Sequence, residues 1–142
     1  MPAENRVKTV MTLWRQSIIV RDPDSVLACD RMFTDEPAVF GPALVESANS
    51  DGEERIRAFS TRVLGKFTDP ALAPVFLHLL EDASPFVRGN AAWALGQLSP
   101  DLGTAALERV RQQDRAESVR QSAAEALARL QRPRNSHPER TH

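Results

Sequence analysis

A short internal repeat is the feature of this sequence that most restricts its fold. Three segments of the 142-residue chain superimpose, each with an aspartate, four further residues, a β-branched aliphatic residue and then an arginine. The three segments run from Asp51 to Arg57, from Asp82 to Arg88 and from Asp114 to Arg120. Successive arginines are 31 and 32 residues apart. A period of this length is typical of proteins in which similar units stack side by side into an elongated array.

Each repeat continues as an amphipathic helix. Seven residues after each arginine stands a leucine, and a small residue follows it, in the pairs Leu64-Gly65, Leu95-Gly96 and Leu127-Ala128. Apolar residues between them fall at helical spacing, so each block predicts one helix of about four turns, entered through the aspartate-containing turn. Second, shorter helices are expected over 71–81 and 101–113. Helices of this length are marginal alone and need neighbours to cover their apolar stripes.

The repeat core, Val87-Arg88-Gly-Asn-Ala91-Ala92-Trp-Ala94-Leu95-Gly96, resembles the short HEAT-like repeats first associated with phycobilin lyases. This resemblance implies an all-α fold, an α-α superhelix or solenoid of about four HEAT-like helix pairs. It also implies that the second helix of each pair lines the concave side. We expect one domain over 1–130, with degenerate repeats over 1–50 and clear repeats over 51–130. About eight helices are expected, followed by a disordered polar tail over 131–142.

Composition restricts the classes of function. The formal net charge is −1, so no global basic field attracts the chain to nucleic acid or to an anionic membrane. No apolar run is long enough to span a membrane, and we expect no membrane partner. Cys29 is the one cysteine, which prevents an intramolecular disulfide and fits a cytoplasmic location. The spacing of histidines, cysteines, acids and glycines predicts no catalytic residue, no metal site and no cofactor.

The recurring acid and arginine predict a structural ladder made by Asp51, Arg57, Asp82, Arg88, Asp114 and Arg120. In stacked repeats the guanidinium groups of such a ladder lie in a row, and a row of this kind can bind phosphates or carboxylates. The alternative is that each arginine pairs with an aspartate at a turn between repeats. That alternative explains why the two residue types recur together, and we favour it.

Five residues outside the ladder are candidate partner contacts. Trp93 replaces the charged residues Arg62 and Glu125 of the flanking repeats, and an exposed tryptophan is a common centre of protein contacts. A tryptophan that covers a groove between two helices is the alternative. The other four candidates lie on the second helices, which the resemblance places on the concave side: His78, Glu81, Glu108 and Arg111.

Charge is distributed unevenly along the chain. Residues 21–54 carry nine acidic and two basic side chains, whereas residues 105–142 carry eight arginines and five acids. Sequence distance becomes spatial distance in a solenoid, so one end is expected to be acidic and the other weakly basic. The interpretations are two solvated surfaces, a basic partner held at the acidic end, or self-association through the solenoid ends.

The sequence therefore favours a non-catalytic protein-binding module, such as an adaptor, a scaffold or a regulatory subunit, with a protein partner that it does not identify. Two other functions stay open. The resemblance implies a phycobilin-lyase-like chaperone or lyase that acts on a tetrapyrrole-bearing protein. A nucleic-acid-binding solenoid is the second, although the acidic N-terminal half argues against nucleic acid as a partner.

Overall fold

The computed structural model describes residues 2–132, and these residues form eight α-helices and one 3₁₀ turn. The helices are α1 (Ala3–Ile19), α2 (Pro23–Asp35), α3 (Pro37–Ser50), α4 (Glu54–Lys66), α5 (Ala73–Leu79), α6 (Pro85–Leu95), α7 (Pro100–Gln113) and α8 (Glu117–Gln131). The 3₁₀ turn, η1 (Pro70–Leu72), leads directly into α5. The all-α prediction and the expected number of helices are confirmed for the described part of the chain.

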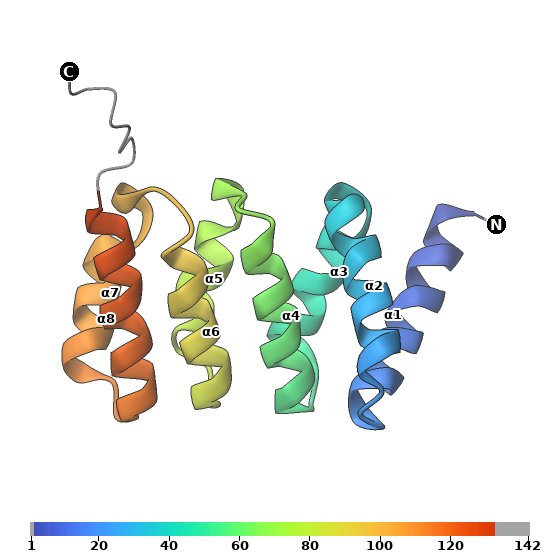
Figure 1. The fold of residues 1–142 in the computed structure, drawn as a ribbon, viewed down its shortest axis with the longest axis horizontal. Coiled ribbons are helices and arrows are strands. Elements are labelled where there is room, and N and C mark those ends of the chain that lie inside the picture. The colour runs from blue at the N-terminus through green and yellow to red at the C-terminus, as the bar shows by residue number, and fades with distance from the viewer. Residues whose placement is uncertain (1, 133–142) are drawn as a thin grey trace, which may run out of the picture.

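The helices form two layers along one axis, which confirms the predicted solenoid (Figure 1). One layer contains α2, α4, α6 and α8, and the other contains α3, α5 and α7. The first helix α1 stands at the N-terminal end, where it contacts α2 and α3. Among the first helices, packing is extensive between α4 and α6 and between α6 and α8, and α7 packs just as closely on α8. The α2 helix meets α4 at far fewer positions.

The core repeats with the sequence. Ile56, Val87 and Val119 stand just before the ladder arginines and are completely or almost completely buried. Leu95, in the middle of the array, is also fully buried. Burial of one such side chain contributes about 1.5–3 kcal/mol, and this gain stabilises helices that would not form alone.

The N-terminal core is aromatic instead of aliphatic. Trp14, Phe33 and Phe40 come from three helices and are fully buried. The ring centroids of Trp14 and Phe33 are 5.1 Å apart, and so are those of Phe33 and Phe40. Edge-on and tilted contacts of this kind add to the stabilisation from burial. The array therefore continues to the N-terminal end with a different core composition.

Helix ends follow the expected turn chemistry. The Asp22 side chain accepts a hydrogen bond from the backbone N–H of Ser25, and the Ser84 hydroxyl accepts one from Phe86. The predicted helix over 71–81 begins one residue earlier, as η1, and α5 ends at Leu79. Of the predicted tail, Gln131 belongs to α8, and residues 133–142 lie outside the described residues. No helix of residues 2–132 has the length and apolarity needed to cross a membrane.

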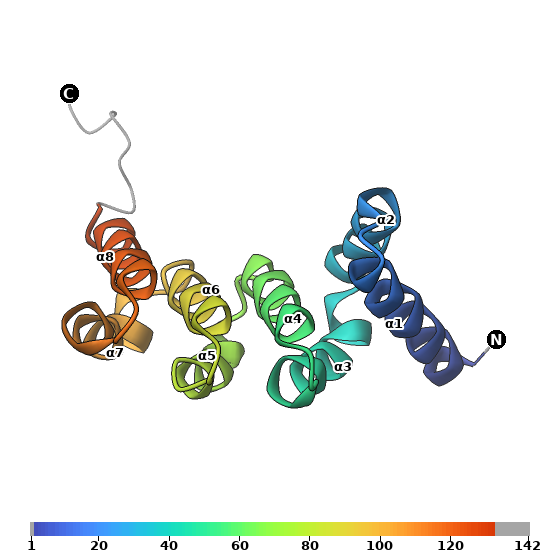
Figure 2. The ribbon, with the colours of Figure 1, turned by 90° about the horizontal axis from the view of Figure 1, so that it is seen from below.

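The array bends, and the direction of the bend corrects one expectation. Viewed along the helices, α2 and α8 rise on either side of α4 and α6, so the hollow side is formed by the first helices (Figure 2). The row α3, α5 and α7 lies on the outer side of this bend. The prediction that the second helices line the concave side is therefore wrong for this chain. At the N-terminal end the bend coincides with the junction where α2 does not continue the close packing of α4 on α6.

Candidate functional site

The ladder residues hold successive repeats together. Arg57 donates from Nε and Nη2 to the Asp82 carboxylate, with both distances 3.1 Å. Arg88 binds Asp114 in the same bidentate way, at 2.9 and 3.1 Å. Each arginine also donates to the backbone carbonyl of the aspartate that opens its own repeat, Asp51 or Asp82. The Arg88 and Asp114 side chains are only 4% and 7% exposed, which leaves little room for an outside anion.

The aspartates also shape the turns. The Asp114 carboxylate accepts a hydrogen bond from the Ala116 N–H at 2.9 Å, and Asp82 accepts one from Ser84 at 2.8 Å. Burial acts to raise the pKa of Asp114, but the hydrogen bonds from Arg88 and Ala116 outweigh it, so the pKa lies below its ordinary value. Each carboxylate therefore starts a helix and joins two repeats.

The two ends of the ladder differ from its middle. No arginine stands in the first turns of α2, where Val26, Leu27 and Ala28 occupy the corresponding positions. Asp51 is held instead by Arg15 of α1, which donates from Nε and Nη2 at 2.8 and 3.1 Å. At the other end Arg120 donates to the Asp114 carbonyl, and no carboxylate of residues 2–132 pairs with it. The sequence analysis missed Arg15, although an aspartate with no arginine in the preceding repeat was a signal that another donor was needed.

Trp93 lies between two helices of the hollow-side layer. Its ring packs over Gly65, where an added Cβ would come within 2.5 Å of the indole, so only glycine permits this approach. The Arg62 guanidinium carbon stands 3.8 Å from the ring centroid, in a cation–π contact. The side chain is partly buried and packs against the core. Trp93 therefore covers the groove between α4 and α6, with part of its ring still accessible.

The four candidates on the second helices do not join Trp93 in one site. Glu108 and Arg111 form an ion pair within one turn of α7, at 2.6 Å, with both side chains about two-fifths exposed. His78 is exposed on α5, and Glu81 is exposed in the turn that follows this helix. These residues lie in the layer opposite Trp93, on the outer side of the bend. Within residues 2–132, no group of three or more histidines, cysteines and acids is arranged to hold a metal ion.

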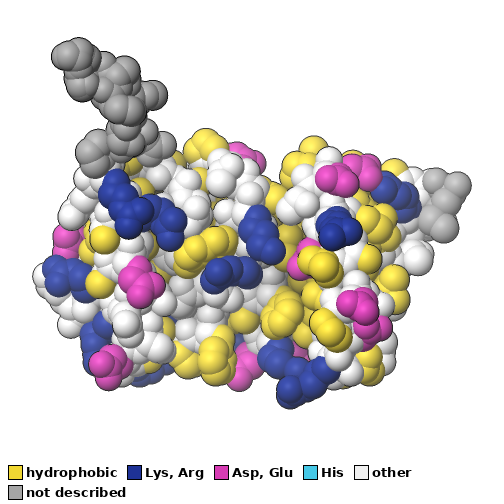
Figure 3. All heavy atoms as spheres, viewed as in Figure 1, with side chains coloured by type: hydrophobic (Ala, Val, Ile, Leu, Met, Phe, Trp, Pro, Cys, Tyr) yellow, Lys and Arg dark blue, Asp and Glu magenta, His cyan; other side chains and the backbone are white. Residues whose placement is uncertain are grey.

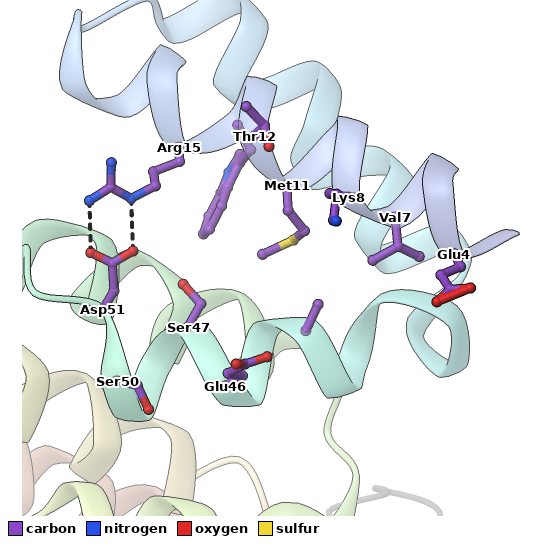
Figure 4. Close-up of a pocket in the computed structure, with 12 residues that line it drawn as sticks. Glu4, Val7, Lys8, Met11, Thr12, Arg15, Glu46, Ser47, Ser50 and Asp51 are labelled. Carbon is purple, nitrogen blue, oxygen red and sulfur yellow. Dashed lines mark hydrogen bonds and ion pairs between the residues drawn. The ribbon is translucent and has the colours of Figure 1, made fainter.

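The first of two grooves at the N-terminal end opens between α1 and α3, with a volume of about 520 Å³. Figure 4 shows Val7 and Met11 of α1 directed toward α3, and the Arg15–Asp51 pair at one end. Glu4, Lys8 and Glu46 add charges of both signs to its rim. A rim of mixed sign gives no electrostatic preference for one kind of partner.

The second groove opens between α2 and α4 on the hollow side of the array, and its volume is about 690 Å³. Leu27 and Phe59 line it with 52% and 41% of their surfaces exposed. Ile18 and Val26 add further apolar surface, and Arg21 and Arg55 stand among the lining residues. Figure 3 shows hydrophobic side chains gathered over α2 and α4 on this face. We call this the α2–α4 groove.

The α2–α4 groove has a packing origin. Gly65 and Gly96 permit close approach between α4 and α6 and between α6 and α8, since a Cβ on Gly96 would lie 2.8 Å from that of Ala126. The α2 helix contains no glycine and no ladder arginine. It therefore has neither the glycine nor the ion pair that brings neighbouring first helices together. The gap between α2 and α4 exposes apolar side chains.

Basic side chains on α4 begin at the groove with Arg55 and continue along the helix beyond it. Arg55, Arg62 and Lys66 have no ion-pair partner within residues 2–132. On the α2 side, Asp30 accepts a hydrogen bond from the Trp14 indole at 2.9 Å. Burial raises the pKa of Asp30 above its ordinary value, although this hydrogen bond opposes the shift. The groove is thus apolar at its centre, with Asp22 and Asp30 on the α2 side and a basic face along α4.

The comparison with known families decides the classification. The family model of HEAT repeats matches residues 41–128, which is more than half of the chain. The protein belongs to the HEAT repeat family. HEAT repeats generally mediate protein interactions, and the family is typically non-catalytic. The match begins at residue 41, thirteen residues before α4 starts at Glu54, so it includes most of α3. No curated protein matches this HEAT repeat chain.

Proposed function

We propose that this HEAT repeat protein is a non-catalytic binding module, an adaptor or scaffold, whose protein partner docks in the α2–α4 groove. One observation carries the proposal. In an array whose other first helices pack closely, this junction stays open and leaves Leu27 and Phe59 half-exposed. Large apolar side chains around a groove are a common feature of protein contact sites.

The rest of the molecule supports a scaffold that is held rigid. The buried Arg88–Asp114 pair and the continuous core keep the repeats from α4 onward in a fixed relation, so the α4 side of the groove is held rigidly. A rigid surface loses little conformational entropy on binding. The single cysteine, Cys29, is buried and unpaired, and we propose a cytoplasmic location on this basis.

Self-association through the solenoid ends has less support. The exposed side chains of α8 include the polar residues Gln121, Glu125 and Arg129, and no large apolar side chain of α8 is exposed. A polar flank of this kind is what the terminal repeat of a solenoid needs to remain in contact with water. We therefore place the protein contact at the opposite, N-terminal part of the array.

The test is affinity purification from the native host's extract with the wild-type chain and with Leu27→Asp, at low and high salt. We expect a stoichiometric protein that survives high salt with the wild type and is absent with Leu27→Asp. Glu108→Gln, on the outer side of the bend, is the matched control and should retain it. Retention by Leu27→Asp would exclude the α2–α4 groove. Recovery of only nucleic acid, or of a bound chromophore, would instead favour one of the two other functions.

A further inference from the structure

We infer that the α2–α4 groove recognises an acidic segment of a protein, one that carries bulky apolar side chains among aspartates or glutamates. This inference rests on the proposed function and adds the chemistry of the partner. It also differs from one interpretation of the acidic stretch 21–54, in which that end of the array holds a basic partner.

Three cations on α4 offer positive charge to a partner. Arg55 lines the groove next to Phe59, and Arg62 and Lys66 follow on the same helix, one and two turns beyond Phe59. The Arg62 guanidinium is oriented by the Trp93 ring and by a long hydrogen bond of 3.4 Å to Asn90. None of the three forms an ion pair among the described residues, so their charges can meet a partner, although Asp30 partly offsets the charge of Lys66.

Few acids stand beside these cations: Glu125 of α8 lines a pocket with Arg62, and Asp30 lies near Lys66. The α6 helix contains no aspartate or glutamate, and α4 has none after Glu54. Figure 3 shows lysine and arginine side chains over α4 and α6, with acidic side chains mostly nearer the two ends of the array. An incoming carboxylate on this face therefore meets positive charge and little repulsion.

The acids on the α2 side of the groove are engaged within the chain. Asp22 accepts hydrogen bonds from the Ser25 backbone and hydroxyl, at 3.3 and 2.8 Å. Asp30 binds the Trp14 indole and lies close enough to Lys66 to interact with it electrostatically. These contacts hold Asp22 at the start of α2 and Asp30 in the middle of this helix, and they involve neither Arg55 nor Arg62.

Apolar anchors complete the surface. Leu27 and Phe59 border the groove, and Phe86 is 64% exposed on α6. Phe86 stands 31 residues after Arg55, at the equivalent position of the next repeat, so it extends the same face. An apolar groove bordered by aromatic rings and unpaired cations fits an acidic amphipathic segment. Its apolar side chains would enter the groove and its carboxylates would meet α4.

The test is selection of random displayed peptides, long enough for several helical turns, on the full-length wild-type chain. We expect the enriched peptides to share a negative net charge and at least two large apolar residues. The double variant Arg55→Glu/Arg62→Glu should bind a selected peptide at least about tenfold more weakly, with the loss reduced at high salt. The matched control is Arg109→Glu/Arg115→Glu, which changes two exposed arginines beside α7 and should bind as the wild type does.

The outcomes separate this inference from the proposed function. Enrichment of neutral or basic peptides, or no enrichment, overturns the acidic partner. If such peptides still lose binding to Leu27→Asp, the groove stands as the docking site. Equal binding by wild type, Leu27→Asp and Phe59→Asp would overturn the proposed groove itself. Circular dichroism of each variant checks that its helices remain folded. An RNA that binds more tightly than every selected peptide would also overturn the inference.

Discussion

The N-terminal helices α1–α3 and the repeats from α4 to α8 connect their units in different ways. From α4 onward, Arg57 and Arg88 come from the first helices of their repeats and bind the aspartate of the next repeat, and glycine permits close helix contact. At the N-terminal end Arg15 of α1 replaces the missing arginine, and α2 stays apart from α4. An arginine supplied by another helix, Arg15 of α1, is thus enough to preserve the turn at Asp51. It does not bring α2 into close packing with α4.

This difference separates stability from binding within one fold. The regular repeats give the buried ion pair and the continuous core, and the degenerate repeat leaves the surface that we assign to a partner. A repeat array can tolerate such a defect because each unit depends mainly on its immediate neighbours. Variants in each region can test whether the regular repeats contribute more to stability than the N-terminal junction does.

The largest expected effect is from Arg88→Ala in the regular part. Removal of this side chain leaves the Asp114 carboxylate buried without its cation, at a cost of about 3–5 kcal/mol in the free energy of unfolding. Arg15→Ala, which breaks the exposed pair at the N-terminal end, should lower stability far less. Urea unfolding followed by circular dichroism measures both. Equal losses would mean that the two ends of the ladder are equivalent.

A core truncation should come next. Leu95 is fully buried between neighbouring helices, so Leu95→Ala is expected to lower the free energy of unfolding by about 2–5 kcal/mol. Leu27→Ala, at the open junction, removes a side chain that is already half-exposed and should change stability by less than about 0.5 kcal/mol. Thermal and urea unfolding give the two values. A large loss with Leu27→Ala would show that α2 is packed as closely as the later repeats.

Close helix approach can be tested by adding one methyl group. Gly65→Ala places a Cβ against the Trp93 ring and should cost about 1–3 kcal/mol. Gly52→Ala is the control, because nothing lies within 4 Å of its added Cβ. The same unfolding experiment compares them. A neutral Gly65→Ala would mean that Trp93 can move away at no cost, which would favour its interpretation as a mobile partner contact.

The smallest effects concern pH and differ in sign between the regions. The pKa of Asp114 is below its ordinary value, so its stabilising contribution is present at neutral pH and is lost as the pH falls through that lowered pKa. The pKa of Asp30 is raised, so its charged form destabilises the fold as the pH rises through the raised pKa.

Two amide variants make this pH comparison. Asp114→Asn should be less stable than the wild type at neutral pH, with a difference that shrinks in acid. Asp30→Asn keeps an acceptor for the Trp14 indole and should match or exceed the stability of the wild type at neutral pH. Urea unfolding at a series of pH values measures both. A parallel pH dependence for the two variants would contradict the assignment of opposite environments.

The sequence by itself determined the helices and their stacking. Apolar residues at helical spacing, such as Val87 and Leu95, mark a buried stripe, and the fixed interval from aspartate to arginine marks where each repeat begins. Both patterns are local, and similar units can bury their stripes only against one another, so the solenoid follows from the repeat. The ladder residues could likewise be named in advance, because the two partners recur together.

Only the tertiary structure decided where the array opens. Arg15 and Asp51 are 36 residues apart and belong to no shared pattern, so their pairing depends on how α1 crosses the turn before α4. Leu27 has the spacing of a core residue, yet it is half-exposed because α2 lacks the glycine and arginine that bring first helices together. The bend of the array at its N-terminal end also occurs at this junction between α2 and α4. Close packing between helices distant in sequence is a property of facing surfaces, and the period of either surface alone does not specify it.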